Sequence, residues 1–132
     1  MKKVILVILI GLVKMLHADD LQCHDIFTTM TSQKGKAPYI SEGSKGKGNT
    51  KIIISFGKKK VFLISGTDKQ ELFWLGKGSG ASYLLEKTKS GNVNLFTLFN
   101  DGTLTISKSY DILGMAKLNV QTIYKCAINT KI

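Results

Sequence analysis

Residues 93–108 read VNLFTLFNDGTLTISK, and this stretch sets the class of fold that the sequence predicts. The turn residues Asn100-Asp101-Gly102 stand between two runs rich in β-branched and aromatic side chains, which is a strong short signal for a β-hairpin. After the turn, the apolar residues Leu104 and Ile106 alternate with hydroxyl side chains, as in a strand with one buried face. The stretch therefore predicts two neighbouring antiparallel strands, 93–99 and 103–108.

The same pattern continues from this hairpin in both directions. Further runs with strand character, separated by turns rich in Gly, Lys, Ser and Asn, are KIIISF at 51–56, VFLIS at 61–65, ELFWL at 71–75, SYLLEK at 82–87 and LNVQTIYKC at 118–126. No segment keeps a helical period over three turns. The sequence predicts an all-β fold of about seven to nine strands, an antiparallel meander that closes into a small barrel or forms a two-sheet sandwich.

The part of the chain before residue 51 has a different texture. Residues 21–30 are predicted to form a first strand, and a long Gly-, Lys- and Ser-rich loop with a short strand near Pro38 follows. We therefore expect one β-rich domain over 19–132, with an irregular, loop-rich part at 19–50 and the main antiparallel sheet at 51–127.

The first 18 residues have the features of a cleaved signal peptide. Lys2 and Lys3 precede the ten apolar residues 4–13, and Ala18 supplies a small residue before the predicted cleavage site. A bilayer-spanning helix needs about 20 apolar residues, so a membrane anchor is the weaker alternative. The prediction is an exported protein, periplasmic or extracellular, with no transmembrane span after cleavage.

Two cysteines lie near the two ends of the predicted mature chain. In an oxidising compartment, Cys23 and Cys126 are expected to form a disulfide bond. The two cysteines fall on the first and last predicted strands, so the bond would join the seam of a closed sheet. No other cysteine or histidine stands at the spacing of a zinc site, so no metal is predicted.

The charged residues exclude one class of partner. Three lysines lie in residues 1–18, so the net charge falls from +10 to +7 after cleavage. Every basic residue is lysine, and arginine is the side chain that reads guanine edges and clamps phosphates in pairs of hydrogen bonds. We therefore expect no specific nucleic-acid binding. The lysine-rich loops form either an ordinary soluble surface or a surface with weak attraction to anionic polymers and lipids.

An enzyme is not predicted. His24 is the only histidine after residue 18, the cysteines are assigned to a disulfide bond, and no G-x-S-x-G, H-E-x-x-H or phosphate-binding loop occurs. No cofactor is expected. The prediction is a non-enzymatic binding or interaction module of unknown target. Its partner would be a small apolar ligand inside the barrel, or a protein or cell-envelope polymer that contacts exposed residues such as Tyr39 and Trp74.

One loop motif adds a second functional alternative. Residues 79–83 read SGASY, which fits the S-G-x-x-Y motif, and Thr88-Lys89-Ser90-Gly91 places a lysine near a glycine. The motif resembles that of the periplasmic and membrane-bound inhibitors of c-type lysozyme, which are small exported β-barrels. The resemblance implies that Ser79, Tyr83 and Lys89 contact the lysozyme cleft. The net charge of +7 opposes this partner, because c-type lysozymes are basic.

Overall fold

Nine antiparallel strands form one sheet in the computed structural model, which describes residues 20–112 and 115–129. The strands are β2 (Asp20–Lys34), β3 (Ile40–Lys45), β4 (Lys51–Phe56), β5 (Val61–Ser65), β6 (Asp68–Lys77), β7 (Ala81–Lys87), β8 (Val93–Phe99), β9 (Thr103–Ile112) and β10 (Ala116–Asn129). None of the described residues is helical. The predicted all-β class is confirmed, and the predicted signal peptide at 1–18 lies outside the described residues.

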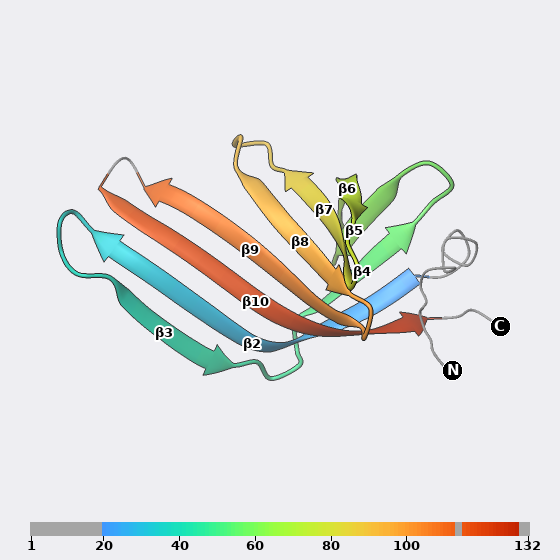
Figure 1. Ribbon diagram of the computed structural model, residues 1–132, viewed down its shortest axis with the longest axis horizontal. Helices are drawn as coiled ribbons and strands as arrows, with labels where there is room; N and C mark the ends of the chain where they lie inside the picture. The colour runs from blue at the N-terminus through green and yellow to red at the C-terminus, as the bar shows by residue number, and fades with distance from the viewer. Residues whose placement is uncertain (1–19, 113–114, 130–132) are drawn as a thin grey trace.

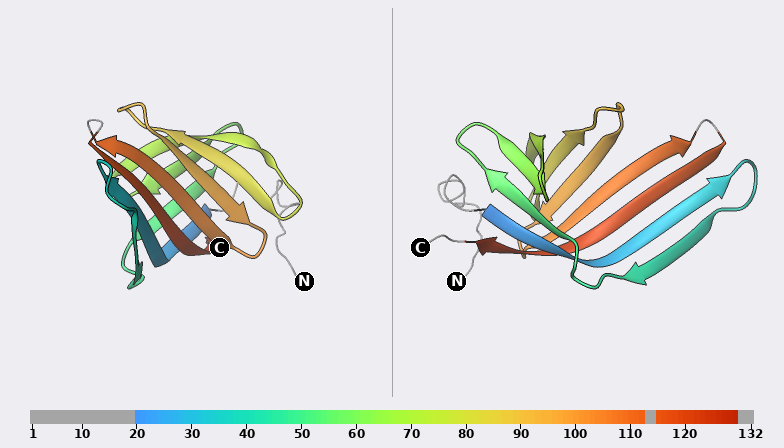
Figure 2. Two further views of the ribbon diagram at one scale, coloured as in Figure 1. Left: turned by 60° about the vertical axis from the view of Figure 1, so that its left-hand side comes forward. Right: turned by 180° about the vertical axis from the view of Figure 1, so that it is seen from behind.

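Eight of the strands close into a barrel. From β4 to β10 each strand pairs with the next, β4 also pairs with β2, and β10 returns to pair with β2. Of the two predicted architectures, the barrel is therefore the one that forms, because full closure removes unpaired strand edges. β3 lies outside the ring and pairs only with β2 among the described strands. Figure 1 shows β3 beside β2, and Figure 2 shows the ring from two further sides.

The buried side chains alternate along the strands as the sequence predicts. In β4 the isoleucines at 52 and 54 and Phe56 point inward, and the residues between them are more exposed. Leu84, Phe96 and Leu104 are fully buried and fill the centre of the barrel. The remaining buried core residues are Cys23, Leu72, Ile106 and Tyr124. The barrel is therefore packed at its centre, as is usual for eight strands.

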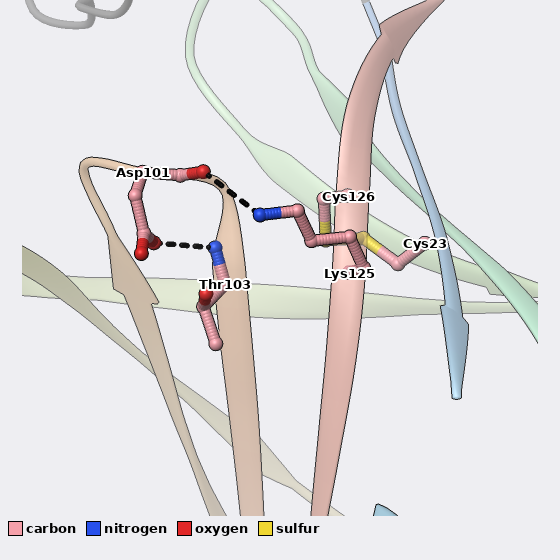
Figure 3. The surroundings of a disulfide bond; sticks show 5 residues. All are labelled: Cys23, Asp101, Thr103, Lys125 and Cys126. Atoms are coloured by element: carbon pink, nitrogen blue, oxygen red, sulfur yellow. Dashed lines mark hydrogen bonds between the residues drawn. A yellow bond between two sulfur atoms is a disulfide. The ribbon is translucent and has the colours of Figure 1, made fainter. Parts of the chain in front are cut away.

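The disulfide bond joins the first and last strands of the ring. Cys23 of β2 and Cys126 of β10 are register partners with Cα atoms 4.0 Å apart, and they are 103 residues apart in sequence. The neighbouring β8–β9 turn is tied to the same strand, because Lys125 donates a hydrogen bond to the backbone oxygen of Asp101 at 3.4 Å (Figure 3). The predicted disulfide at the barrel seam is confirmed. Such bonds persist in oxidising compartments, which agrees with an exported protein.

The segment before residue 51 is more regular than predicted. β2 is a strand of 15 residues, and β3 spans Ile40–Lys45, although an irregular, loop-rich part was expected at 19–50. The reason is tertiary: β2 pairs with β10 along its whole length, from Asp20 opposite Asn129 to Lys34 opposite Ala116. The polar run TTMTSQK at 28–34 has no clear alternation of its own, and pairing with β10 keeps it extended.

Four strands continue past one end of the barrel. Beyond the last register pair of β8 with β9, which joins Asn94 to Lys108, a four-stranded part of the sheet projects outward. It consists of β3 with residues 27–34 of β2, 109–112 of β9 and 116–121 of β10, and we call it the sheet extension. In Figure 1 it is the long sweep of β9, β10, β2 and β3 toward the left.

Candidate functional site

The barrel has a cavity at one end. A cavity of about 540 Å³ opens at the end of the barrel where β4, β6 and β8 begin and where β5 and β7 end. This is the end from which the sheet extension projects, and the disulfide bond lies nearer the other end. The cavity has the size of an ordinary small-molecule site. Leu84, Phe96 and Leu104 fill the centre, so the space for a ligand lies at this mouth rather than along the whole barrel.

Two kinds of side chain line the cavity. The apolar and aromatic ones form its inner part, and they are Ile52, Leu63, Phe96, Ile106 and Tyr124. The polar and charged ones are more numerous, and they are Thr50, Ser65, Asp68, Lys69, Gln70, Glu86, Lys89, Asn94 and Lys108. The chemistry of the site is therefore more polar than that of a pocket for a purely apolar ligand.

Asn94 is the least ordinary of these residues. It begins the lumen-facing row of β8, is 4% exposed, and donates from Nδ2 to Oε1 of Glu86 at 2.7 Å. Glu86 is its register partner on β7. Because the carboxylate of Glu86 accepts, it turns the amide so that Nδ2 faces β7. The Oδ1 atom of Asn94 is then left buried without a hydrogen-bond partner in the described part of the protein.

An unpartnered buried carbonyl has an energetic cost. Leaving such a group without a donor costs about 1–3 kcal/mol, and in native proteins each case calls for an explanation. Here the atom belongs to a residue that lines the cavity, so a small turn of the Asn94 side chain would present it to an N–H or O–H group of a molecule in the cavity. Asn94 is therefore the candidate recognition residue of the cavity.

Lys108 lies directly beside Asn94. The two residues are register partners on β9 and β8, and Lys108 follows Leu104 and Ile106 on the inward face. Lys89 contributes a second ammonium group at the rim. Glu86 is occupied by the Asn94 amide, and Lys69 has its ammonium group 4.3 Å from the centre of the Phe62 ring. Lys108 and Lys89 are thus the cations best placed to meet an anionic group.

Tyr124 contributes a hydroxyl group to the cavity wall. Burial raises the pKa of the Tyr124 hydroxyl, and the nearby Asp25 carboxylate raises it further. The phenol therefore stays protonated at neutral pH and keeps its capacity to donate or accept a hydrogen bond. The wall thus remains uncharged at this point.

The sequence-predicted contact residues lie apart from one another. Ser79 lies in the turn between β6 and β7, and Tyr83 and Trp74 are exposed on these strands near that turn. Lys89 lies beyond the opposite end of β7, which is roughly 20 Å long. Ser79, Tyr83 and Lys89 therefore do not form one compact contact loop. Of these residues, only Lys89 reaches the cavity.

Tyr39 lies elsewhere again, in the connection between β2 and β3, and is 64% exposed. It shares no surface loop with Trp74, since the β2–β3 connection lies at the tip of the sheet extension and the β6–β7 turn at the opposite end of the molecule. A single contact surface that contains both aromatic residues is therefore not supported by the fold.

Sequence reasoning did not identify Asn94, Glu86 or Lys108, although a signal for two of them was present. In VNLFTLF, Asn94 occupies the same alternating positions as Phe96 and Leu98, and in TLTISK, Lys108 occupies those of Leu104 and Ile106. A polar residue in a buried row is a deviation from the two-residue period. Asn94 and Lys108 lie at an open mouth rather than in the core because of the way the barrel closes.

Residues 20–112 and 115–129 contain no group of three or more His, Cys, Asp or Glu side chains placed to hold a metal ion. Within the same ranges, no helix has the length and apolar character needed to cross a membrane. Comparison of the chain with protein-family models, curated proteins and solved structures finds no match to any of the three, so the function has to be inferred from the barrel mouth itself.

Proposed function

We propose that this protein is an exported, non-enzymatic binding protein that holds a small polar molecule, or the polar part of a larger one, in the mouth of its barrel. The observation that carries the proposal is the unpartnered Oδ1 atom of Asn94, buried in the wall of a cavity of about 540 Å³. A ligand with an N–H or O–H group would relieve the cost of this buried carbonyl.

The neighbouring charges define the second feature of the ligand. Lys108, which lies beside Asn94 in the register, and Lys89 at the rim supply ammonium groups that would pair with an anionic group. The proposed ligand therefore carries a hydrogen-bond donor for Asn94 and a negative charge for the lysines. The purely apolar ligand that the sequence suggested as an alternative fits this lining less well.

The simplest probe with both groups is N-acetylglycine, which has one amide N–H and one carboxylate. Its binding would be followed by NMR titration of the isotope-labelled full-length protein. We expect chemical-shift changes that are centred on the Asn94 side-chain amide and on Lys108, and that weaken as salt is added. Binding of the probe elsewhere on the surface, or no shift change at millimolar concentration, would contradict the proposal.

A matched pair of variants tests the role of Asn94. Asn94→Leu keeps the approximate shape of the side chain but removes the carbonyl, so the probe should bind at least about tenfold more weakly, as expected for one lost hydrogen bond of about 1.4 kcal/mol. Asn119→Leu is the control, because Asn119 lies on the outer face of β10 and donates to Ser109 at 3.0 Å. Equal binding by Asn94→Leu and the wild type would exclude Asn94 as the recognition residue.

A further inference from the structure

The inner face of the sheet extension carries a group of accessible apolar side chains. Side chains alternate along each strand, and the residues continuous with the barrel exterior are Thr29 and Thr31 of β2, Asn119 and Gln121 of β10, and Ser107 and Ser109 of β9. The residues continuous with the barrel lumen include the apolar side chains Met30 of β2, Leu118 and Val120 of β10, Tyr110 of β9 and Ile40 of β3. The same face also carries Thr28, Ser32 and Lys34 of β2 and Glu42 and Ser44 of β3, so the inner face is mixed rather than wholly apolar.

This inner face is open. Met30 is 42% exposed and Ile40 is 58% exposed, and Leu118, Val120 and Tyr110 are only half-buried. No described element packs across these side chains. An amphipathic sheet normally buries its apolar face against a partner. Something outside the described residues is thus expected to cover it.

The inner face continues directly from the cavity wall. A single cross-strand row runs from Asn94 on β8 through Lys108 on β9 and Val120 on β10 to Met30 on β2, and it ends at Glu42 on β3. Along this row the chemistry changes from a buried carbonyl acceptor to a cation, then to two apolar side chains, and then to a carboxylate. Neighbouring strands are about 4.8 Å apart, so the part of the row from Asn94 to Met30 spans roughly 14 Å.

We propose that the ligand is an anionic amphiphile whose polar head occupies the barrel mouth and whose acyl chain lies along the inner face of the sheet extension. This inference rests on the proposed function. It adds an acyl chain to the ligand and assigns the inner face as the surface that binds this acyl chain. The order of groups along the row carries it: the head donates to Oδ1 of Asn94, the negative charge meets Lys108, and the chain contacts Val120 and Met30. The chain would run from Val120 past Met30 to Ile40, which lies two residues from Glu42 on β3. This path crosses two strand spacings and one two-residue step, roughly 12 Å, so a lauroyl chain is long enough to follow it.

The test compares two probes that differ only in the chain. N-acetylglycine carries the head alone, and N-lauroylglycine carries the same amide and carboxylate with ten additional methylene groups. Burying one side of this chain on the inner face should make N-lauroylglycine bind at least about 100-fold more tightly, even though each methylene is only partly buried. Binding is measured by isothermal titration calorimetry below the critical micelle concentration, on the full-length protein.

Two variants at neighbouring positions test whether the acyl chain binds to the inner or to the outer face of the sheet extension. Met30→Gln keeps the length of the side chain but makes the inner face polar, and Thr29→Gln makes a similar change on the outer face of the same strand. We expect Met30→Gln to weaken the binding of N-lauroylglycine by about 5–10-fold and to leave the binding of N-acetylglycine unchanged. Thr29→Gln should change neither. Both positions are solvent-accessible, so neither substitution is expected to impair folding.

The outcomes distinguish this inference from the proposed function. If N-acetylglycine binds at Asn94 but the lauroyl chain raises the affinity by less than about fivefold, the mouth binds a head group and the inner face does not bind an acyl chain. If neither probe binds at the mouth, the proposed function fails. Met30-dependent dimerisation in sedimentation velocity, or Met30-dependent binding to phosphatidylglycerol vesicles without binding of monomeric N-lauroylglycine, would assign the inner face to a second copy or to a membrane instead.

Discussion

Removal of the disulfide bond is expected to cost this barrel a large part of its stability. The perturbation is the double variant Cys23→Ala/Cys126→Ala, which opens a covalent loop with a sequence separation of 103. In the chain-entropy model, a loop of about 100 residues is worth about 4.7 kcal/mol at 25 °C, because the cross-link restricts the unfolded chain. Small domains are stable by only about 5–15 kcal/mol, so the variant should be marginal.

The position of the bond sharpens this expectation. Cys23 is 2% exposed and belongs to the core, and its partner strand β10 is the one that closes the ring. The bond therefore ties together the only two strands that are distant in sequence and adjacent in the barrel wall. We expect the whole fold to loosen, with faster amide exchange in β4–β8 as well as in β2 and β10.

The assay is urea unfolding of wild type and variant, monitored by Trp74 fluorescence and by circular dichroism. The free energy of unfolding should fall by about 4–5 kcal/mol, which corresponds to a decrease in melting temperature of roughly 15–20 °C. The control is Thr28→Ala/Thr122→Ala, which alters another inward-facing β2–β10 pair, joined by a 3.3 Å hydroxyl contact, and should cost about 1 kcal/mol. A loss below about 1 kcal/mol for the cysteine variant, or an equal loss for the control, would refute the reasoning.

Two further predictions concern backbone packing and pH. Gly46→Ala should lower the free energy of unfolding by about 1–3 kcal/mol, because an added Cβ would lie 2.7 Å from the backbone oxygen of Asp25, and urea unfolding measures the loss. Hydrogen bonds from the backbone N–H and the side chain of Thr103 lower the pKa of the Asp101 carboxyl group below 3.8, and Lys125 lowers it further. The ionised carboxylate therefore stabilises the fold above pH 3.8, and this contribution is lost as the pH falls through the lowered pKa. Asp101→Asn should cost about 0.5–1 kcal/mol at pH 7, as expected for an exposed charge, and in a series of unfolding curves the difference from wild type should close as the pH falls through the lowered pKa.

Each of these predictions has a result that would contradict it. Gly80→Ala is the control for Gly46→Ala, because a Cβ at Gly80 would have no atom within 4 Å, and its effect should stay within about 0.5 kcal/mol. Equal effects at the two glycines would show that the close approach to Asp25 is unimportant. For Asp101, a difference between wild type and Asp101→Asn that is constant from pH 7 to pH 2 would show that the charge of the carboxylate does not contribute.

The strands were largely readable in the sequence because each is a local pattern. The runs 51–56, 61–65 and 93–99 coincide with β4, β5 and β8, and the NDG turn occurs where it was predicted, with Gly102 at a φ of +92°. Local turn chemistry and a two-residue period suffice for such elements. The disulfide pair also followed from the order of the strands, since the two cysteines lie on the first and last strands of a closed sheet.

The long β2 strand and the sheet extension could not be recognised in this way. Residues 28–34 have few apolar side chains, and their extended conformation depends on pairing with residues 116–122 of β10, nearly a hundred positions later. Sequence separation of this size leaves no local signal. The same pairing places Met30 beside Val120 and so brings together apolar side chains from two strands that each look polar or mixed.

The candidate site shows the same division between local pattern and tertiary contact. The sequence alone determined the β class, the turns and the inward row of each strand, because these depend on neighbours within a few residues. It also predicted the Cys23–Cys126 bond, because the chain has just two cysteines and they follow a predicted signal peptide. Only the closed barrel determined that Asn94 and Lys108, two polar residues in inward rows, stand at an open mouth instead of in a filled core. The physical reason is that a cavity is bounded by side chains from many strands, and its presence depends on how all of them pack together.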